Sequence, residues 1–364
     1  MNKPLFSLFL FLLISCSAYS QSGTIYIPGT YIKEDTASTG LYQLTFQDNL
    51  NKHTLKELNL PISSQWQIDT ISNTLIGFGQ NKFHIAKSIN NSDFSTISKS
   101  FETPNFRSFG SLSPDGKDIV YVLTKSGKAV NKTKEFKLSV TSLNQNKDTV
   151  ILENSSTEIF REPVWSPDGK DIYYSLGNIE MFTAPYEANI PGFTLMKISR
   201  DGKVNQKVLP SCKFYSSASP IKVNFNPDKN IMAVSGKFDS KAIRYGLYIM
   251  RNDGSYLNFI KENGGQSTWS PDGKWLAFSA DGDIWRVNKQ GKELQQLTHG
   301  EEFAENPVWS PDWKYLLFVN SKALPGIADN RNAKIFLINL ESKTKTILST
   351  DFYNITGSSI IWTK

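Results

Sequence analysis

Trp269-Ser270-Pro271-Asp272-Gly273-Lys274 is the stretch of this sequence that decides the fold. The same Ser-Pro-Asp-Gly motif stands at residues 113–116 and 166–169, and variants stand at 226–229 (Asn-Pro-Asp-Lys) and 310–313 (Ser-Pro-Asp-Trp). Each copy lies between a short apolar run and a run of β-branched or aromatic residues. Repetition with a period of tens of residues is typical of propellers and solenoids. The repeat therefore predicts the architecture before any single residue is considered.

The geometry of a tight turn explains the motif. A type I turn favours Ser at its first position, Pro at its second and Gly at its fourth, where Gly adopts the left-handed conformation. We therefore interpret Asp115, Asp168 and Asp272 as turn-forming residues rather than catalytic acids. Lys229 and Trp313 stand where the turn needs Gly, and a left-handed non-Gly residue costs roughly 1 kcal/mol.

One repeat unit divides into four short strands. Around Trp269 these are expected at 266–270, 275–279, 283–287 and 293–297, with Gly-containing turns between them. Dense short strands with evenly spaced turns indicate an all-β, closed or radial architecture. The expected fold is a β-propeller of four-stranded antiparallel blades.

The number of repeats predicts the number of blades. The residues before the turns are Leu112, Trp165, Phe225, Trp269 and Trp309, and nine residues after each stand Tyr121, Tyr174, Val234, Phe278 and Phe318. A degenerate copy lies at Trp66 and Phe78, and residues 360–362 repeat only a first strand. N-terminal segments 24–27, 41–46 and 54–59 would complete that last blade, so that both chain ends close one ring. We predict seven blades in one domain over 21–364; six is the alternative, if the segment before Trp66 decorates a smaller ring.

The first twenty residues have the pattern of an export signal. Lys3 precedes an apolar run over 5–14, which is too short to span a bilayer. Cleavage before Gln21 would give a periplasmic or secreted protein, whereas the run ending at Cys16 fits a lipoprotein box. In that second reading Cys16 would carry a lipid, giving an outer-membrane lipoprotein whose lipid is its only membrane contact. Both readings place the mature protein outside the cytoplasm.

Composition excludes several classes of partner and stabilisation. The net charge of +6 is spread among 40 Lys and Arg and 34 Asp and Glu, without a basic block. Nucleic acid is therefore not an expected partner. Cys212 is the one cysteine after the export signal, so no intramolecular disulfide is expected.

The Trp-Ser-Pro-Asp-Gly-Lys hairpins at 165–170 and 269–274 resemble the repeats of TolB-type propellers, also called PD40 or WD40-like repeats. The resemblance covers nearly the whole mature chain and implies the propeller fold. It extends to exported proteins of Bacteroidetes, many of which begin their mature chain with Gln. We expect the chain to lack the N-terminal domain of TolB. The hydrolase domain of related peptidases and the histidine-rich metal centre of oligogalacturonate lyases are not expected either.

Residues suited to chemistry are few. His53, His84 and His299 have no spacing that would bring them together, so no metal site is predicted. Glu301, Glu302 and Glu305 cluster in a link between blades, which we interpret as a solvated loop or as a contact for a cation or basic partner. Arg161-Glu162-Pro163 and Glu305-Asn306-Pro307 occupy equivalent places, which favours a structural role at the start of a first strand. No catalytic residue and no cofactor are predicted.

Loop length locates the predicted binding surface. Strand directions alternate, so the Pro-Asp-Gly turns lie on one face, while second-to-third-strand loops and blade-to-blade links lie on the other. The long connections 123–135, 176–193, 211–220, 236–245 and 320–333 belong to this second face. Long loops on a rigid scaffold commonly carry binding residues. The candidates are Phe182, Tyr186, Phe193, Phe214, Tyr215, Arg244 and Arg331, unless the aromatics only pack their own loops.

These observations predict a non-enzymatic, exported propeller that binds an envelope or extracellular protein through its long-loop face. The alternative is a glycan-binding or carbohydrate-active propeller, because related propellers act on polysaccharide fragments and loop aromatics can stack on sugar rings.

Overall fold

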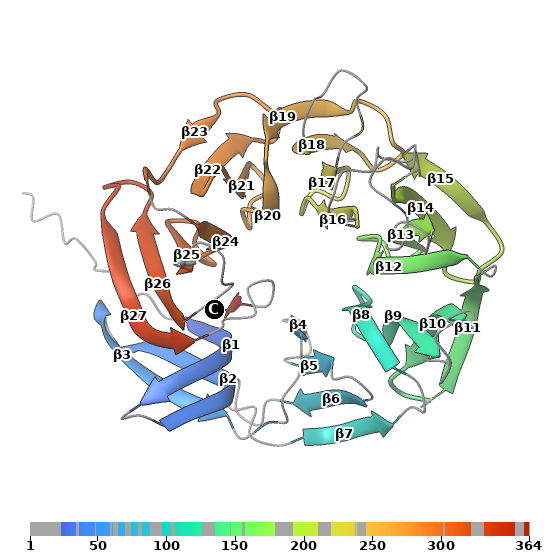
Figure 1. Cartoon of the computed structure of the whole chain (residues 1–364), viewed down its shortest axis with the longest axis horizontal. Coiled ribbons are helices and arrows are strands. Elements are labelled where there is room, and N and C mark those ends of the chain that lie inside the picture. The colour runs from blue at the N-terminus through green and yellow to red at the C-terminus, as the bar shows by residue number, and fades with distance from the viewer. Residues whose placement is uncertain are drawn as a thin grey trace, which may run out of the picture.

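The chain folds into seven four-stranded antiparallel blades arranged around a ring (Figure 1). Five sheets have four strands each, and one sheet of eight strands contains two neighbouring blades. This confirms the predicted seven-bladed propeller. The structure is a computed structural model. It describes residues 23–33, 36–47, 49–58, 60, 65–69, 74–78, 82–87, 97–102, 106–125, 135–145, 147–154, 157–178, 192–209, 220–236, 238, 245–300, 303–321, 331–353 and 360–363.

Each blade runs from an innermost to an outermost strand. Blades 1 to 3 consist of β4 (Gln65–Asp69), β5 (Thr74–Phe78), β6 (Lys82–Lys87) and β7 (Ile97–Glu102); β8 (Phe106–Leu112), β9 (Asp118–Lys125), β10 (Glu135–Ser142) and β11 (Lys147–Glu153); and β12 (Glu158–Trp165), β13 (Asp171–Asn178), β14 (Thr194–Ser199) and β15 (Asn205–Leu209). Blades 4 to 6 consist of β16 (Lys222–Phe225), β17 (Ile231–Gly236), β18 (Gly246–Arg251) and β19 (Asn258–Glu262); β20 (Gly265–Trp269), β21 (Trp275–Ala280), β22 (Asp283–Asn288) and β23 (Gln295–Gln296); and β24 (Ala304–Trp309), β25 (Tyr315–Ser321), β26 (Arg331–Asn339) and β27 (Lys345–Tyr353). Blade 7 consists of β28 (Ile361–Thr363), β1 (Thr24–Lys33), β2 (Thr36–Gln47) and β3 (Asn49–Leu58).

Blade 7 closes the ring as predicted, because it combines both chain ends. The C-terminal β28 pairs with β1 through Thr24↔Thr363 and Tyr26↔Ile361. The same β1 then pairs with β2, and β2 with β3. A second connection was not predicted: the far end of β1 pairs with β27 of blade 6 at Tyr31↔Phe352.

The Ser-Pro-Asp-Gly turns have the geometry that the sequence predicts. Ser270 Oγ donates to Asp272 Oδ1 (2.6 Å) and accepts from the backbone N–H of Trp275 (3.0 Å). Gly273 has a left-handed φ of 69°. Equivalent Ser-Asp bonds of 2.6 Å begin at Ser113, Ser166 and Ser310. These carboxylates therefore hold turns together, which confirms the structural interpretation.

The two turns without Gly are also left-handed. Lys229 has a φ of 66° and Trp313 a φ of 52°. Trp313 is 52 % exposed, so packing does not compensate its strained backbone. In the first of these turns Asn226 replaces Ser, and its Nδ2 donates to the carbonyl of Gly273 in the next blade (2.8 Å).

Tryptophan side chains fasten neighbouring blades to each other. Trp165 Nε1 donates to the carbonyl of Ser111 (3.1 Å). Ser111 directly precedes Leu112, which is the pre-turn residue of the preceding blade. Trp269 and Trp309 make the same bond to Asn224 and Thr268, at 3.0 Å each. Each indole buries a large apolar surface and satisfies its single donor at a blade interface. This explains why Trp recurs immediately before the turn.

The hydrophobic core is divided into clusters that lie between blades. Tyr26 and Leu41 of blade 7, for example, pack against Trp66 and Leu75 of blade 1. The residues nine positions after the pre-turn residue are all buried; they are Tyr121, Tyr174, Val234, Phe278 and Phe318. The repeat thus specifies the apolar contacts that join successive blades.

The first blade departs from the predicted register. Ile68 pairs with Leu75, seven residues later, as Trp165 pairs with Ile172. Trp66 pairs with Gly77 instead and lies two residues before the equivalent position. Trp66 marks the blade but does not occupy the position of the other tryptophans, because it stands two residues further from a turn of the same length.

Candidate binding surface at the channel entrance

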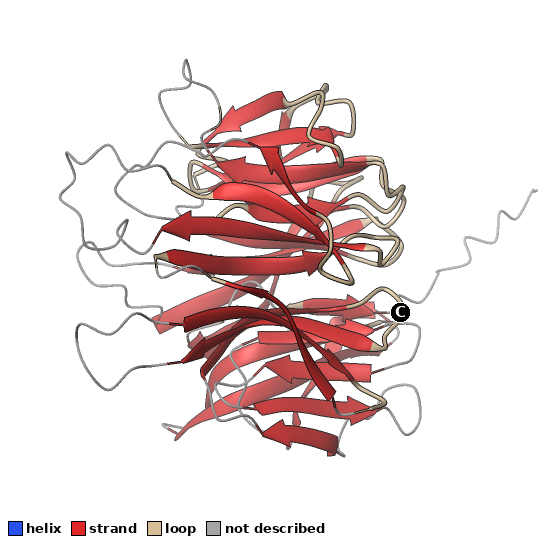
Figure 2. Cartoon of the chain, turned by 90° about the vertical axis from the view of Figure 1, so that its right-hand side faces the viewer, coloured by secondary structure: helices blue, strands red, loops and turns tan. Residues whose placement is uncertain are grey.

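The two faces of the ring differ in how strands are connected. The first two strands of blades 2 to 6 are joined at the turn face by the Pro-Asp-Gly motif or its variants. Antiparallel pairing places the end of the second strand at the opposite face, which we call the loop face; Leu176↔Thr194 and Gly236↔Gly246 are pairs near that face. Figure 2 shows most of the described turns gathered at one side of the ring.

Most of the predicted loop residues lie outside the described residues; these are Phe182, Tyr186, Phe214, Tyr215 and Arg244. Cys16 also lies outside them. Arg331 opens β26, where its backbone pairs with Tyr353. Phe193 is only 1 % exposed and belongs to a core cluster with Phe160 and Tyr174. Its position fits the packing role that was the alternative to binding.

The innermost strands surround the centre of the ring, and several of them are bulged near the loop face. We call this central part of the loop face the channel entrance. The register shifts between Arg161 and Val164 in β12, between Gly265 and Thr268 in β20, and between Glu305 and Val308 in β24. One residue in each bulge has a left-handed backbone; these are Glu162 (φ 48°), Gln266 (φ 38°) and Asn306 (φ 54°). Bulges re-aim side chains, and strained backbone is concentrated at functional sites.

The bulges of blades 5 and 6 are joined by side-chain hydrogen bonds. Gln266 Oε1 accepts from Ser279 Oγ (3.0 Å) and from the backbone N–H of Asn306 (3.3 Å). Gln266 Nε2 donates to Glu305 Oε2 (3.0 Å). Glu305 of the predicted acidic cluster is therefore part of a network between blades; Glu301 and Glu302 lie outside the described residues.

Charged residues gather at the channel entrance of blades 3 and 4. Burial raises the pKa of Glu162, while Lys222 and Arg161 act in the opposite direction. The Arg161 guanidinium lies 5.5 Å from the ring centre of Phe136 in blade 2. A carboxyl group whose charged form is disfavoured by burial and favoured by two cations can exchange a proton or bind a cationic group.

The histidines do not contribute a shared site. His84 is buried in β6, whereas His53 on β3 and His299 after β23 are exposed. The described ranges contain no group of three His, Cys, Asp or Glu side chains that could hold a metal ion. They also contain no helix long and apolar enough to cross a bilayer.

Sequence reasoning found part of the channel entrance. The structural role predicted for Arg161-Glu162-Pro163 and Glu305-Asn306-Pro307 is confirmed, since both segments form bulges within first strands. Gln266 and Lys222 were not singled out. Each lies three residues before a pre-turn residue, which is Trp269 for Gln266 and Phe225 for Lys222. This position does not indicate that a side chain interacts with a neighbouring blade.

Known proteins resemble the fold of this chain more than its sequence. No family model matches the sequence. An uncharacterized protein of Agrobacterium fabrum is 27% identical over 171 residues, and the match spans 45% of this chain and about half (52%) of that relative. Its activity and partners are therefore not transferable to this chain.

Solved structures cover most of the ring. An oligogalacturonate lyase from Vibrio parahaemolyticus aligns with a TM-score of 0.60 at 12% identity, covering 88% of this chain and 92% of the lyase. TolB from Acinetobacter baumannii aligns with a TM-score of 0.47 at 12% identity, covering 92% and 82% of the two chains. At such identities the likeness concerns the fold alone. The Pro-Asp-Gly repeats and the seven closed blades together make this chain a seven-bladed β-propeller, whose repeats resemble those of TolB-type propellers.

Proposed function

We propose that this chain is an exported, non-enzymatic propeller that binds an envelope protein through its loop face. The observation that carries the proposal is the difference between the two faces. On the turn face, most side chains of the repeat are engaged in forming the turns themselves. On the loop face, strained bulges present charged and polar side chains, and the long connections begin and end there.

The channel entrance supplies a rigid base for such recognition. Arg161, Glu162 and Lys222 provide both signs of charge on innermost strands of blades 3 and 4. The Gln266 network fixes the neighbouring bulges of blades 5 and 6. Binding groups that are held by packed strands lose little conformational entropy when a partner docks. Polar side chains on such a base favour specificity for one partner.

Two trimmed variants test the proposal. Residues 179–191 of blade 3 are replaced by a short Gly-Ser linker, which leaves the strand ends Asn178 and Thr194 and the buried Phe193 in place. A matched variant shortens 322–330 between β25 and β26 in the same way. Both are used with the parent to capture crosslinked proteins from the native envelope.

We expect one envelope protein to be captured by the parent and lost from at least one trimmed variant that keeps the parental melting temperature. Equal capture by the parent and both variants, or no specific capture by the parent, would contradict the proposal. Mass spectrometry of the mature N-terminus separates a free Gln21 from a lipidated Cys16.

A second candidate function is glycan binding or carbohydrate chemistry at the channel entrance. The observation that favours it is Glu162, whose pKa is raised by burial beside two cations, as is suitable for a general acid. A glycan panel combined with metal analysis of the purified protein tests this candidate. If the parent converts a glycan and Glu162→Gln does not, the carbohydrate function is supported and the scaffold proposal is contradicted. If the parent neither binds nor converts any glycan, the carbohydrate function is contradicted.

A further inference from the structure

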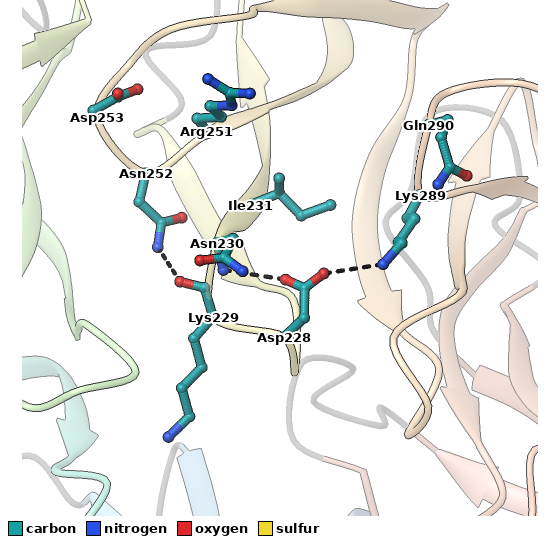
Figure 3. A pocket seen from close by; sticks show the side chains of 9 residues that line it. All are labelled: Asp228, Lys229, Asn230, Ile231, Arg251, Asn252, Asp253, Lys289 and Gln290. Atoms are coloured by element: carbon teal, nitrogen blue, oxygen red, sulfur yellow. Dashed lines mark hydrogen bonds and ion pairs between the residues drawn. The ribbon is translucent and has the colours of Figure 1, made fainter.

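A pocket of about 670 Å³ opens on the turn face, between blades 4 and 5 (Figure 3). Small-molecule sites usually measure about 300–1,000 Å³, so this volume suits a small ligand. The pocket is formed by the β16–β17 and β18–β19 turns of blade 4 and the β22–β23 turn of blade 5. Its lining residues are Asp228, Lys229, Asn230, Ile231, Arg251, Asn252, Asp253, Lys289 and Gln290.

The pocket lies at the interface, or seam, between blades 4 and 5. The side chains at this seam differ from those at the seam between blades 2 and 3. In the seam between blades 2 and 3, the Arg200 guanidinium lies over the Trp165 ring at 5.2 Å and forms ion pairs with Asp115 and Asp118. At the seam between blades 4 and 5, Lys289 is the residue equivalent to Arg200. The backbone N–H of each donates to the carbonyl of the residue that follows the inner turn, which is Lys274 for Lys289 and Lys170 for Arg200. Among the residues that the structure describes, the Lys289 ammonium pairs with Asp228 alone, at 3.2 Å. Lys289 and its partner Asp228 both line the pocket.

Groups around this space have unused hydrogen-bonding capacity. The Arg251 guanidinium lies 3.9 Å from the ring centre of Tyr256, and among the described residues it makes no hydrogen bond or ion pair. Asn252 Nδ2 donates to the carbonyl of Lys229 (2.7 Å), whereas the buried Oδ1 of Asn252 receives no hydrogen bond from any described residue. A buried acceptor without a donor is costly, so the amide of Asn252 is held in place at the expense of one unsatisfied oxygen.

The balance of charge points to an anion. Three cations and two carboxylates line the pocket. Asp228 is paired with Lys289, and Asp253 accepts hydrogen bonds from Ser255 at 2.6 and 2.9 Å within its own turn. Hydrogen bonds from Ser255 and the charge of Arg251 lower the pKa of Asp253, but the Arg251 guanidinium forms no hydrogen bond or ion pair with a described residue. Its donors remain available, and a planar guanidinium binds carboxylate and phosphate groups in a bidentate manner.

The remaining lining groups suit a hydroxylated skeleton. Figure 3 shows Ile231 between Arg251 on one side and Gln290 on the other. The amides of Asn230 and Gln290 can each donate to and accept from hydroxyl groups. Ile231 offers a small apolar floor.

The exposed Tyr256 lies beside the pocket, with its ring centre 3.9 Å from the Arg251 guanidinium. Its left-handed backbone (φ 55°) belongs to the turn itself, since Glu293 at the equivalent position of blade 5 has a φ of 57°. The ring contact is what distinguishes this turn, because it restricts the position of the Arg251 side chain.

We propose that this pocket binds a small hydroxylated molecule that carries one oxyanion, a carboxylate or a phosphate. Arg251 binds the oxyanion, and the amides of Asn230 and Gln290 bind hydroxyl groups. The pocket lies on the face opposite the channel entrance, so the inference is independent of the proposed protein partner.

Titration of the full mature chain tests the proposal. Sodium glucuronate, glucose 6-phosphate and neutral glucose are added up to about 10 mM while amide NMR shifts are recorded, a range that detects millimolar dissociation constants. We expect saturable shifts at residues 228–231, 251–253 and 289–290 with at least one anionic sugar. Glucose should bind at least about tenfold more weakly, since it lacks the charge-assisted bonds. The anionic sugar that binds identifies the oxyanion.

Substitutions separate this site from general effects of charge. Arg251→Gln should weaken binding by about tenfold or more, while the melting temperature stays unchanged because Arg251 is exposed. Lys170→Gln is the matched control, as it removes an exposed cation from the same face of another blade. Absence of binding by both anionic sugars, equal binding of glucose, or full binding by Arg251→Gln would overturn the proposal.

Discussion

Blade 5 and blade 7 have the same four-stranded plan but are assembled from the chain in opposite ways. Blade 5 lies within 265–296, and short turns join its strands. Blade 7 combines β28 with β1, so that Thr363 pairs with Thr24. Closing a long loop costs more conformational entropy than closing a short turn, and non-local pairing forms later. A local motif can therefore specify blade 5, whereas blade 7 depends on contacts between distant segments.

The two blades are also held by different interactions. Blade 5 is joined to blade 4 through the Trp269 indole and to blade 6 through the Gln266 network. Blade 7 has no Pro-Asp-Gly turn in the sequence and instead uses the long β1, which pairs with both β28 and β27. Tyr31, Tyr42 and Phe352 pack there with ring centres 5.2–5.6 Å apart. Extended pairing and aromatic packing replace the stabilisation that the turn motif gives elsewhere.

The largest expected effect is the removal of β28. Deleting residues 359–364 removes the buried Ile360 and exposes the inner edge of β1. We expect the free energy of unfolding to fall by about 3–5 kcal/mol, as for large-to-small changes in a core. Thermal and denaturant unfolding measure the loss. A truncated protein as stable as the parent would show that the β1–β27 pairing closes the ring without β28.

Trp269→Phe tests the connection between blades in the regular part of the ring. It removes the bond to the Asn224 carbonyl and part of a buried side chain, so a loss of about 1–3 kcal/mol is expected in denaturant unfolding. The matched control is Trp275→Phe, since the Trp275 ring is half-buried and faces Arg286 at 4.4 Å. Equal losses in the two variants would mean that the indole bond contributes nothing specific.

The turn glycine and its replacement in blade 6 should respond in opposite directions. Gly273→Ala forces a left-handed Ala whose Cβ would lie 2.7 Å from Asn226 Oδ1, so we expect a loss of about 1–2 kcal/mol. Trp313→Gly relieves a strained, exposed residue, and the melting temperature should stay unchanged or rise. A clear fall in the melting temperature of Trp313→Gly would mean that this side chain packs against or binds something.

Acid should weaken the turns of the regular blades. Partial burial raises the pKa of Asp272, but hydrogen bonds from Ser270 and from the backbone N–H of Lys274 more than offset it, so that this pKa is lowered. A lowered folded-state pKa adds stability above the unfolded value, near 3.9, and this stability is lost as pH falls through the folded value. Unfolding of Asp272→Asn should therefore depend less on pH than that of the parent below about pH 4. Parallel pH profiles would contradict this assignment.

Much of the fold could be predicted because its decisive signals are local. Pro and Gly fix the backbone at the turns, and an apolar residue nine positions after each pre-turn residue is buried in every regular blade. The chain-end closure followed from counting these units. The register of blade 1 could not be predicted from Trp66, because this tryptophan stands two residues further from the turn than the others and is buried all the same.

The candidate sites were much harder to predict. Glu162 and Asn306 are recognisable as residues before Pro, but the sequence does not reveal that Gln266 adopts the same bulged backbone. The turn-face pocket is lined by three turns of two blades, at 228–231, 251–253 and 289–290, and no local sequence pattern indicates that these turns meet. Loop aromatics were predicted from their exposure in long connections, yet Phe193 is buried, because a loop end can return to the core.

By itself, the sequence determined the all-β class, the four-stranded unit, the seven blades and the role of the turn aspartates. These features depend on backbone conformations and apolar spacing within a few residues. Only the tertiary structure decided the β1–β27 pairing, the charged channel entrance and the pocket between blades 4 and 5. Those features come from side chains that lie far apart in the chain and meet only when neighbouring blades pack together.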